Sequence, residues 1–362
     1  MKTCHAVHLS DSSDMSMIES ESVQMVVTSP PYPMIEMWDD LFAAQNPEIQ
    51  THLNADNGME AFELMHQQLD AVWDEVYRIL APGSFACINI GDATRKIHED
   101  FMLYPNHSRI LQHLVRSGFS PMPSIIWRKQ TNAPNKFMGS GMLPGGAYVT
   151  LEHEYILILR KGSKREFKKQ KQKEKRRESA LFWEERNQWF SDIWFDLKGA
   201  VQKLSTKELR KRSAAFPFAL PYRLINMYSV KEDTVVDPFL GIGTTTLAAM
   251  AAARNSIGFE LEKGFMSHIA ERIEKGVKTL NSETSQRVAR HMDFVHARKE
   301  QKKELKHFNS NYDISVVTKQ EKELCFNKIE DIEYNKEKKE FHVSHSIMAY
   351  EGGVRLSLLS LS

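Results

Sequence analysis

The segment TVVDPFLGIGTTTLAAMAAARNSIGFELE, residues 234–262, constrains the fold more than any other part of the chain. Its apolar start predicts a buried strand, a loop with two glycines follows, an alanine-rich run predicts a helix, and a second strand ends at Glu260. A strand, a helix and a second strand in this order place both strands in parallel in one sheet. The chain therefore contains an α/β domain, with the glycine loop at the carboxyl end of a strand.

The residues of this loop predict an adenosine-type ligand. Gly241 and Gly243 allow a tight turn and a close approach of the backbone, and Thr244 can cap the following helix. Glu260 lies 23 residues after Asp237, close to the offset at which an acidic residue meets ribose hydroxyls. The loop lacks the lysine of a phosphate loop and the third glycine of GxGxxG. An ordinary turn with a helix cap is the alternative.

A second loop, SPPY, comprises Ser29, Pro30, Pro31 and Tyr32 and follows the apolar run VQMVVT. That run predicts a short buried strand, and the two prolines end it because proline cannot donate to a sheet ladder. Taken alone, the loop is a rigid turn. Its place after a buried strand is where a doubly wound sheet carries its functional loops.

Helices and strands alternate through the rest of the first half of the chain, which favours a mostly parallel, doubly wound sheet. Helical spacing of apolar residues covers 62–80 and 108–117, and strands are expected at 85–92, 123–127 and 152–162. Beyond residue 281 we expect a helix over KEQKKELK and short apolar segments that pair as an added small sheet.

Composition excludes several classes of protein. The 362 residues include 48 Lys plus Arg and 47 Asp plus Glu, so a net charge of +1 excludes polyanion binding by bulk charge. Cys4, Cys87 and Cys325 lie far apart and form no disulfide or zinc-site pattern, which fits a reducing compartment. The start of the chain has no apolar targeting segment, so we expect a soluble, cytoplasmic, nucleoid-associated protein without a membrane partner.

The two loops together resemble a known family. SPPY at 29–32 with DPFLGIGTT at 237–245 is similar to the S-adenosylmethionine-dependent DNA amino-methyltransferases of the β group, whose Rossmann-like fold is circularly permuted. SPPY rather than DPPY most resembles the N4-cytosine enzymes. The resemblance covers about residues 5–275, with support from HLSDS, INIGD, IIWRKQTNAP, HEYILILRK and AAFPFALPYRLI. In the last of these, Ser213 and Ala214 replace the usual His-Pro.

The resemblance implies S-adenosylmethionine as cofactor, double-stranded DNA as substrate, and a cognate restriction endonuclease as functional partner. It implies a cofactor site formed by Asp11, Phe216, Asp237, Pro238, Phe239, Gly241, Gly243, Thr244, Thr245 and Glu260. It divides the chain into a catalytic half (1–160), a basic and aromatic target-recognition region (161–212), a cofactor half (213–280) and a C-terminal extension of unknown role (281–362).

The basic run 161–178 holds ten Lys or Arg against three Glu and lies where this family inserts its target-recognition region. Phosphate contacts are therefore expected from Lys168, Lys169, Arg176 and Arg177. A solvated segment is the alternative. The tryptophans that follow, Trp183, Trp189 and Trp194, are expected in the core of this region rather than as base-stacking platforms.

The chemistry expected of the SPPY loop is activation of an exocyclic amine. The Ser29 hydroxyl and the Pro30 carbonyl can accept hydrogen bonds from the amine and localise its lone pair, and Tyr32 can stack on the flipped-out base. No cysteine follows a proline, which disfavours ring-carbon methylation, and this transfer needs no metal. His153 and Glu154 are expected to be structural, because adjacent strand residues point to opposite faces.

These features predict a site-specific DNA methyltransferase acting on cytosine N4 in a restriction-modification system. An adenine-N6 enzyme with the same fold is the nearest alternative, because both bases present an exocyclic amine to the same acceptors. A catalytically silent DNA-binding protein is the second.

Overall fold

Five parallel strands form the centre of the main sheet. They are, in spatial order, β3 (Leu80–Ile90), β2 (Val23–Thr28), β12 (Thr234–Asp237), β13 (Asn255–Phe259) and β1 (Lys2–His8). This computed structural model describes residues 1–98, 100–129, 138–139, 141–199 and 216–349. The two strands of the glycine-loop unit lie side by side, and the strand before SPPY is the next neighbour, so the predicted α/β fold with a mostly parallel central sheet is confirmed.

Antiparallel strands extend this centre on the catalytic side. β10 (His153–Lys161) is antiparallel to β3, and it also pairs with β6 (Phe119–Pro121) and β7 (Ile125–Arg128). β11 (Ile193–Trp194) ends this side of the sheet, parallel to β7. Trp189 and Trp194 are buried here, so their predicted place in the core is confirmed, whereas Trp183 is half-buried.

The opposite side of the sheet corrects one expectation. β17 (Glu340–Ile347) pairs with β1, and β16 (Asn327–Asn335) pairs with β17, both antiparallel. These apolar C-terminal segments therefore extend the main sheet, where pairing covers the N–H and C=O groups of β1 that an edge strand would expose. Among the described residues after α10, β14 (His307–Asn309) and β15 (Ile314–Val316) form a small sheet of their own.

Helices cover both faces of the sheet. Side chains of α3 (Gly58–Ile79) and α4 (Asn106–Arg116) pack with Val26 on one face. Those of α8 (Ala219–Tyr228), α9 (Thr244–Ala251) and α10 (Phe265–Glu300) pack with Val27 on the other. Because successive strand residues point to opposite faces, each central strand contributes to both cores. This is the expected doubly wound arrangement.

The C-terminal extension is continuous with the cofactor half. Helix α10 runs through residue 280, where the sequence suggested a boundary. The helix expected over KEQKKELK is wrong, since α10 ends at Glu300 and Lys302 takes a positive φ of 56°. Arg287 of α10 is buried and donates to Glu185 of α6 (Trp183–Trp189) at 2.7 Å, which joins the extension to the inserted region.

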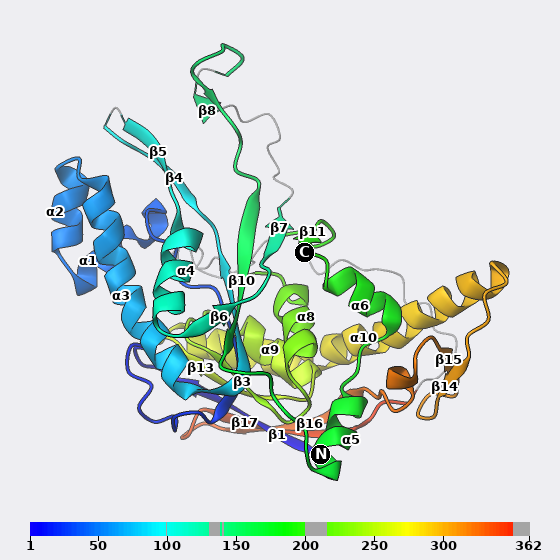
Figure 1. The fold of residues 1–362 in the computed structure, drawn as a ribbon. Coiled ribbons are helices and arrows are strands. Elements are labelled where there is room, and N and C mark those ends of the chain that lie inside the picture. Colours follow the sequence, from blue (N-terminus) through cyan, green and yellow to red (C-terminus); the bar gives the residue numbers. More distant parts are fainter. Residues whose placement is uncertain (99, 130–137, 140, 200–215, 350–362) are drawn as a thin grey trace.

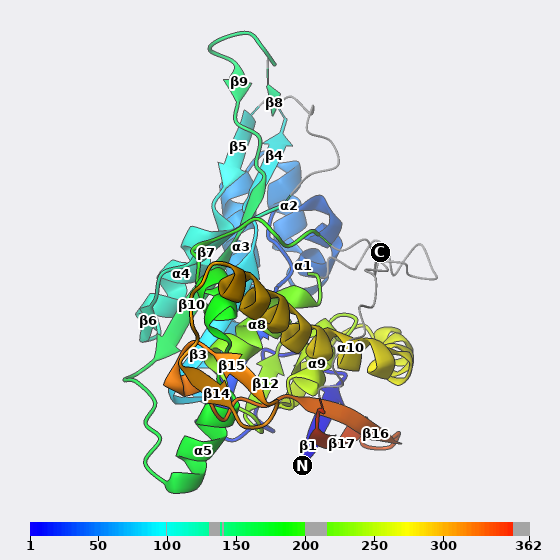
Figure 2. The same ribbon diagram turned by 90° about the vertical axis from the view of Figure 1, so that its right-hand side faces the viewer.

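Two hairpins project from the end of the molecule where the parallel strands finish (Figures 1 and 2). They are β4 (Ala93–Ile97) with β5 (Asp100–Tyr104), and β8 (Met138–Gly139) with β9 (Ala147–Tyr148). Helix α5 (Gln170–Glu178) lies at the opposite end, near the N-terminus (Figure 1). The remaining short elements are η1 (Glu36–Trp38), α1 (Asp39–Gln45), α2 (Glu48–Asn54) and η2 (Lys319–Glu321). None of the described helices has the length and apolarity needed to cross a membrane.

Candidate active site

The two predicted loops leave the sheet from neighbouring strands at one edge. Val235 and Val236 of β12 pair with Met25 and Val26 of β2 in parallel register, so Thr28 and Asp237 end side by side. The Thr28 hydroxyl donates to Asp237 Oδ1 at 2.6 Å, and the Thr245 hydroxyl donates to the other oxygen. Burial raises the pKa of Asp237 to about 6. This carboxyl therefore joins the SPPY strand to the glycine loop and the start of α9.

Glu260 follows β13 and faces the glycine loop. Its carboxyl accepts from the Gly241 N–H at 2.7 Å and from the Glu262 N–H at 2.8 Å. Burial raises its pKa to about 7. Gly241 has a φ of 54°, and a side chain there would meet nothing within 4 Å. The expected tight turn is confirmed, and the acidic partner lies against it.

The start of α9 differs from the expectation in one detail. Gly243, with a φ of 79°, is the N-cap residue, and Thr244 is already the first helical residue, so the expected Thr244 cap is wrong. Glycine adopts the left-handed conformation easily, so the turn ends at Gly243 and the helix begins at the next residue. The Thr244 hydroxyl instead accepts from Arg272 at 3.3 Å.

A cavity of about 440 Å³ lies between the two loops. Eleven of the predicted site residues line it: Asp11, Ser29, Pro30, Pro31, Phe216, Asp237, Pro238, Phe239, Gly241, Thr244 and Glu260. Tyr32, Gly243 and Thr245 are not among the lining residues. Sequence reasoning missed an apolar wall from the segment around α1 and from α3, which includes Trp38, Leu41, Phe42, Leu69 and Val72. The spacing of Leu69 and Val72 predicted a helix, and nothing in it distinguished a core face from a cavity wall; the other three residues lie in a segment for which the sequence predicted no element.

A polar cluster lies behind the SPPY loop. The Tyr32 hydroxyl contacts Ser29 Oγ at 3.1 Å, donates to Glu154 Oε2 at 3.0 Å and accepts from Asn89 Nδ2 at 2.8 Å. Asn89 also donates to Glu154 at 2.7 Å, and Lys129 Nζ donates to the other carboxylate oxygen. Burial and the Glu154 carboxylate raise the pKa of Tyr32 well above its usual value.

Sequence reasoning missed Asn89 and Glu154 as members of the site. Both are buried polar residues inside otherwise apolar strands, β3 and β10. That pattern was the available signal, because a buried polar group needs a hydrogen-bonding partner. The ring of Tyr32 packs against Gly91, where a β-carbon would lie 2.9 Å from Tyr32 Cε2. The tyrosine is therefore held by its ring as well as by its hydroxyl.

The structure does not bring the four predicted DNA-contact residues to the cavity. They lie on or just before α5, whose Lys175 pairs with Glu232 ahead of β12, at the edge where the parallel strands begin. Arg177 pairs with Glu323, Lys168 pairs with Glu166, and Arg176 lies over the Phe167 ring. Lys169 is exposed at the N-cap of α5.

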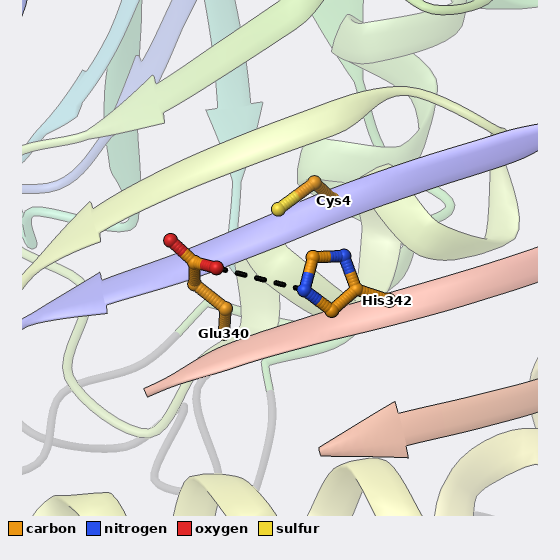
Figure 3. A group of neighbouring side chains, drawn as sticks. All are labelled: Cys4, Glu340 and His342. Carbon is orange, nitrogen blue, oxygen red and sulfur yellow. Dashed lines mark ion pairs between the residues drawn. The ribbon is translucent and has the colours of Figure 1, made fainter. Parts of the chain in front are cut away.

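Among the described residues, one group of side chains has donor atoms close enough to hold a metal ion: Cys4, Glu340 and His342 (Figure 3). Cys4 faces His342 across the β1–β17 pair, and His342 Nε2 lies 3.5 Å from Glu340 Oε2. The His342 side chain is 48% exposed. This trio does not line the cavity, and we assign it no part in the chemistry there.

The SPPY loop precedes the glycine loop in the chain. The two loops follow adjacent parallel strands, and both line one cavity. Fold and site together define the methyltransferase class with a permuted Rossmann-like sheet. The chain belongs to the N6/N4 DNA methylase family, whose family model matches residues 23–272. It is therefore a DNA methyltransferase.

Relatives and a solved structure agree with this assignment. The chain is 52% identical over 325 residues to the Type II methyltransferase M.MthZI of Methanothermobacter thermautotrophicus, covering 90% of each chain. It is 50% identical over 287 residues to M.MjaI of Methanocaldococcus jannaschii, covering 76% of this chain and 92% of the relative. The Thermus thermophilus protein TTHA0409, solved with S-adenosyl-L-methionine, superposes with a TM-score of 0.58 at 30% identity, covering 75% and 95%.

Proposed function

We propose that the protein transfers a methyl group from S-adenosylmethionine to the exocyclic N4 amine of a flipped-out cytosine at a specific DNA sequence. One observation carries the proposal: Ser29 and Pro30 line the same cavity as Asp237 and Glu260. A cofactor held by the second pair would therefore present its methyl group to a base held by the first. Alignment of this kind supplies much of the catalysis in a direct transfer.

The glycine-loop side of the cavity suits S-adenosylmethionine. Glu260 offers a carboxylate to ribose hydroxyls, and Gly241 lets the backbone approach the ligand closely. Asp11 and Phe216 line the same cavity and are proposed for the adenine and methionine ends, as the family resemblance implies. The cofactor carries a sulfonium cation, which two acidic groups at one wall attract better than they would a pyrophosphate.

The SPPY side suits an exocyclic amine. The lone pair of that amine is delocalised into the ring, so it attacks a methyl group only when acceptors draw it out of conjugation. The Ser29 hydroxyl and the Pro30 carbonyl are such acceptors, and proline holds its carbonyl without a competing N–H donor. Serine in place of aspartate at position 29 supports cytosine N4 over adenine N6, through the family resemblance. A cognate endonuclease in a Type II system is part of this proposal.

The target-recognition role of 161–212 is also a proposal, and the position of α5 argues against a DNA contact by the basic part of this region. β11 extends the sheet beside β7. The basic segment around α5 lies near the N-terminus, at the opposite end of the molecule from the two hairpins (Figure 1). Lys175 pairs with Glu232 ahead of β12, whereas the cavity is lined by Asp237 and Glu260 at the other ends of the strands, so the charges of α5 are poorly placed to hold the DNA that presents the target base. The β4–β5 and β8–β9 hairpins project from the end of the molecule where the parallel strands finish and are better placed for that contact.

Methyl transfer from labelled S-adenosylmethionine to DNA tests the proposal. The Ser29→Ala variant should lower turnover by at least about 100-fold while leaving cofactor affinity within about twofold, because the hydroxyl acts on the amine in the transition state. Ser163→Ala, which removes the same group at an exposed position, is the matched control and should transfer at the wild-type rate. Transfer by Ser29→Ala at the rate of this control would refute the role of the loop.

A further inference from the structure

The cluster behind the SPPY loop ends on a carboxylate that the methyl transfer leaves without a role. Glu154 is 9% exposed, it lies on β10 rather than on either loop, and it does not line the cavity. Its Oε2 atom accepts from Tyr32 and from Asn89. Tyr32 in turn contacts Ser29, which does line the cavity. A continuous line of polar atoms therefore runs from the cavity to Glu154.

The hydrogens along this line have one consistent direction. A carboxylate oxygen only accepts, so both Asn89 and Tyr32 must donate to Glu154 Oε2. The single hydrogen of the Tyr32 hydroxyl is then committed to Glu154, and its oxygen accepts from Asn89. Ser29 must therefore donate its own hydrogen to the Tyr32 oxygen, 3.1 Å away. Ser29 Oγ accepts a long contact of 3.5 Å from Asn89 Nδ2, and its second lone pair is left for a donor in the cavity, such as a target amine.

We propose that Ser29, Tyr32 and Glu154 form a proton relay that carries away the proton released by the methylated amine. This inference rests on the proposed function, because the amine of the bound base is the donor. The relay goes beyond the proposed function because it gives Glu154, a residue that does not touch the base, a defined role in turnover.

The step balances in atoms and charge. The S–CH₃ bond of the sulfonium breaks as the N–CH₃ bond forms, so the positive charge moves to the amine nitrogen and S-adenosylhomocysteine leaves neutral. The amine proton passes to Ser29 Oγ, the Ser29 proton to the Tyr32 oxygen, and the Tyr32 proton to Glu154 Oε2. Glu154 becomes a neutral acid and later releases its proton to water. Tyr32 stays protonated throughout, in agreement with its raised pKa.

Lys129 and Asn89 position the acceptor. Lys129 Nζ donates to the Glu154 oxygen that is not part of the line, and the Lys129 ammonium lies 4.7 Å over the Trp127 ring. Asn89 is 2% exposed and donates to both Tyr32 and Glu154. The carboxylate is therefore fixed by three donors, which keeps it oriented before each turnover.

The test compares single-turnover methylation in Glu154→Gln, Tyr32→Phe and the double variant. Each single change breaks the line while keeping the shape of the side chain. Each should slow the chemical step by about 100-fold, the low end of what a positioned proton acceptor contributes. The rate of the double variant should lie within about threefold of the rate of either single variant, because both changes break the same relay. In the wild type, the rate of this step should depend on the deuterium fraction of the solvent in the way expected when more than one proton moves. The variants should lose this dependence.

Glu152→Gln is the matched control, since it removes a carboxylate that pairs with Arg128 outside the line, and it should react at the wild-type rate. Thermal unfolding of every variant identifies those that misfold, and the KM for DNA identifies those that bind DNA weakly. A variant that is normal by both measures but reacts slowly has a slower chemical step. An unchanged rate in Glu154→Gln would overturn the relay while leaving methyl transfer intact, as would losses that multiply in the double variant. A wild-type protein that methylates no DNA would overturn the proposed function itself.

Discussion

Lowering the pH from about 8 to about 6 should weaken cofactor binding, and Glu260 is the cause. Burial raises the pKa of Glu260 to about 7 in the free protein. Two ribose hydroxyls can each donate to an oxygen of this group only when the carboxyl is ionised. If the ionised form alone binds, the competent fraction falls from about 90% to about 10% over this range, so the dissociation constant rises about tenfold.

The Glu260→Gln variant separates this cause from others. It should bind S-adenosylmethionine about 10- to 100-fold more weakly above pH 7, the usual cost of losing hydrogen bonds to a charged group. It should also lose most of the pH dependence. Any that remains belongs to Asp237, whose pKa of about 6 is the other raised value at this wall. Calorimetric titration at three pH values checks this. A wild-type affinity that is flat between pH 6 and pH 8 would refute the reasoning.

The same carboxyl has the opposite effect on stability. The folded-state pKa of about 7 lies above the ordinary value of 4.5, so the folded protein keeps a proton that the unfolded chain releases. The free energy of unfolding therefore falls as the pH rises from 4.5 toward 7. Above that range the ligand-free Glu260→Gln variant should be more stable than the wild type, by at most about 3 kcal/mol. Urea unfolding at pH 5 and pH 8 measures this, and a difference that does not grow with pH would contradict it.

Three further predictions concern the loops and the surface. Gly243→Ala should destabilise the protein by about 1–2 kcal/mol in urea unfolding, because its φ is 79° and a β-carbon would lie 3.1 Å from Ile269; equal stability would mean that the turn relaxes. Thr28→Val should lower the free energy of unfolding by about 1–3 kcal/mol, because Asp237 loses a buried donor. If Thr28→Val costs the same amount when it is introduced into an Asp237→Asn protein, this hydrogen bond is not the source of the cost. Replacing the four basic side chains near α5 by glutamine should change kcat/KM for DNA less than about threefold at moderate salt; a larger loss would place DNA there. These residues are Lys168, Lys169, Arg176 and Arg177.

The placement of the two loops at the ends of strands could be predicted because each loop follows an apolar run that ends abruptly. Residues 234–236 and 23–28 form adjacent parallel strands, so Asp237 and Ser29 lie at one edge, as carboxyl ends of parallel strands must. Local patterns also located the positive φ values of Gly241 and Gly243. These features depend on short-range sequence, which is why they could be read from it.

Contacts between distant segments could not be read in this way. Glu154 meets Tyr32 across 122 positions of sequence, and nothing in HEYILILRK says which strand β10 pairs with. The pairing of β17 with β1 is likewise set by the open edge of β1. The basic run was placed by analogy with the order of segments in the family, and the order of segments does not determine the edge of the sheet at which α5 packs.

Identification of the modified base tests the central claim most directly. DNA from a methylation-free host expressing this protein should be sequenced by a single-molecule method and hydrolysed for nucleoside mass spectrometry, beside DNA from the same host expressing Ser29→Ala. We predict N4-methylcytosine at one short sequence, and its loss in the variant. N6-methyladenine at that sequence would contradict the assignment of the target base, and an absence of modified bases would contradict the assignment of the activity.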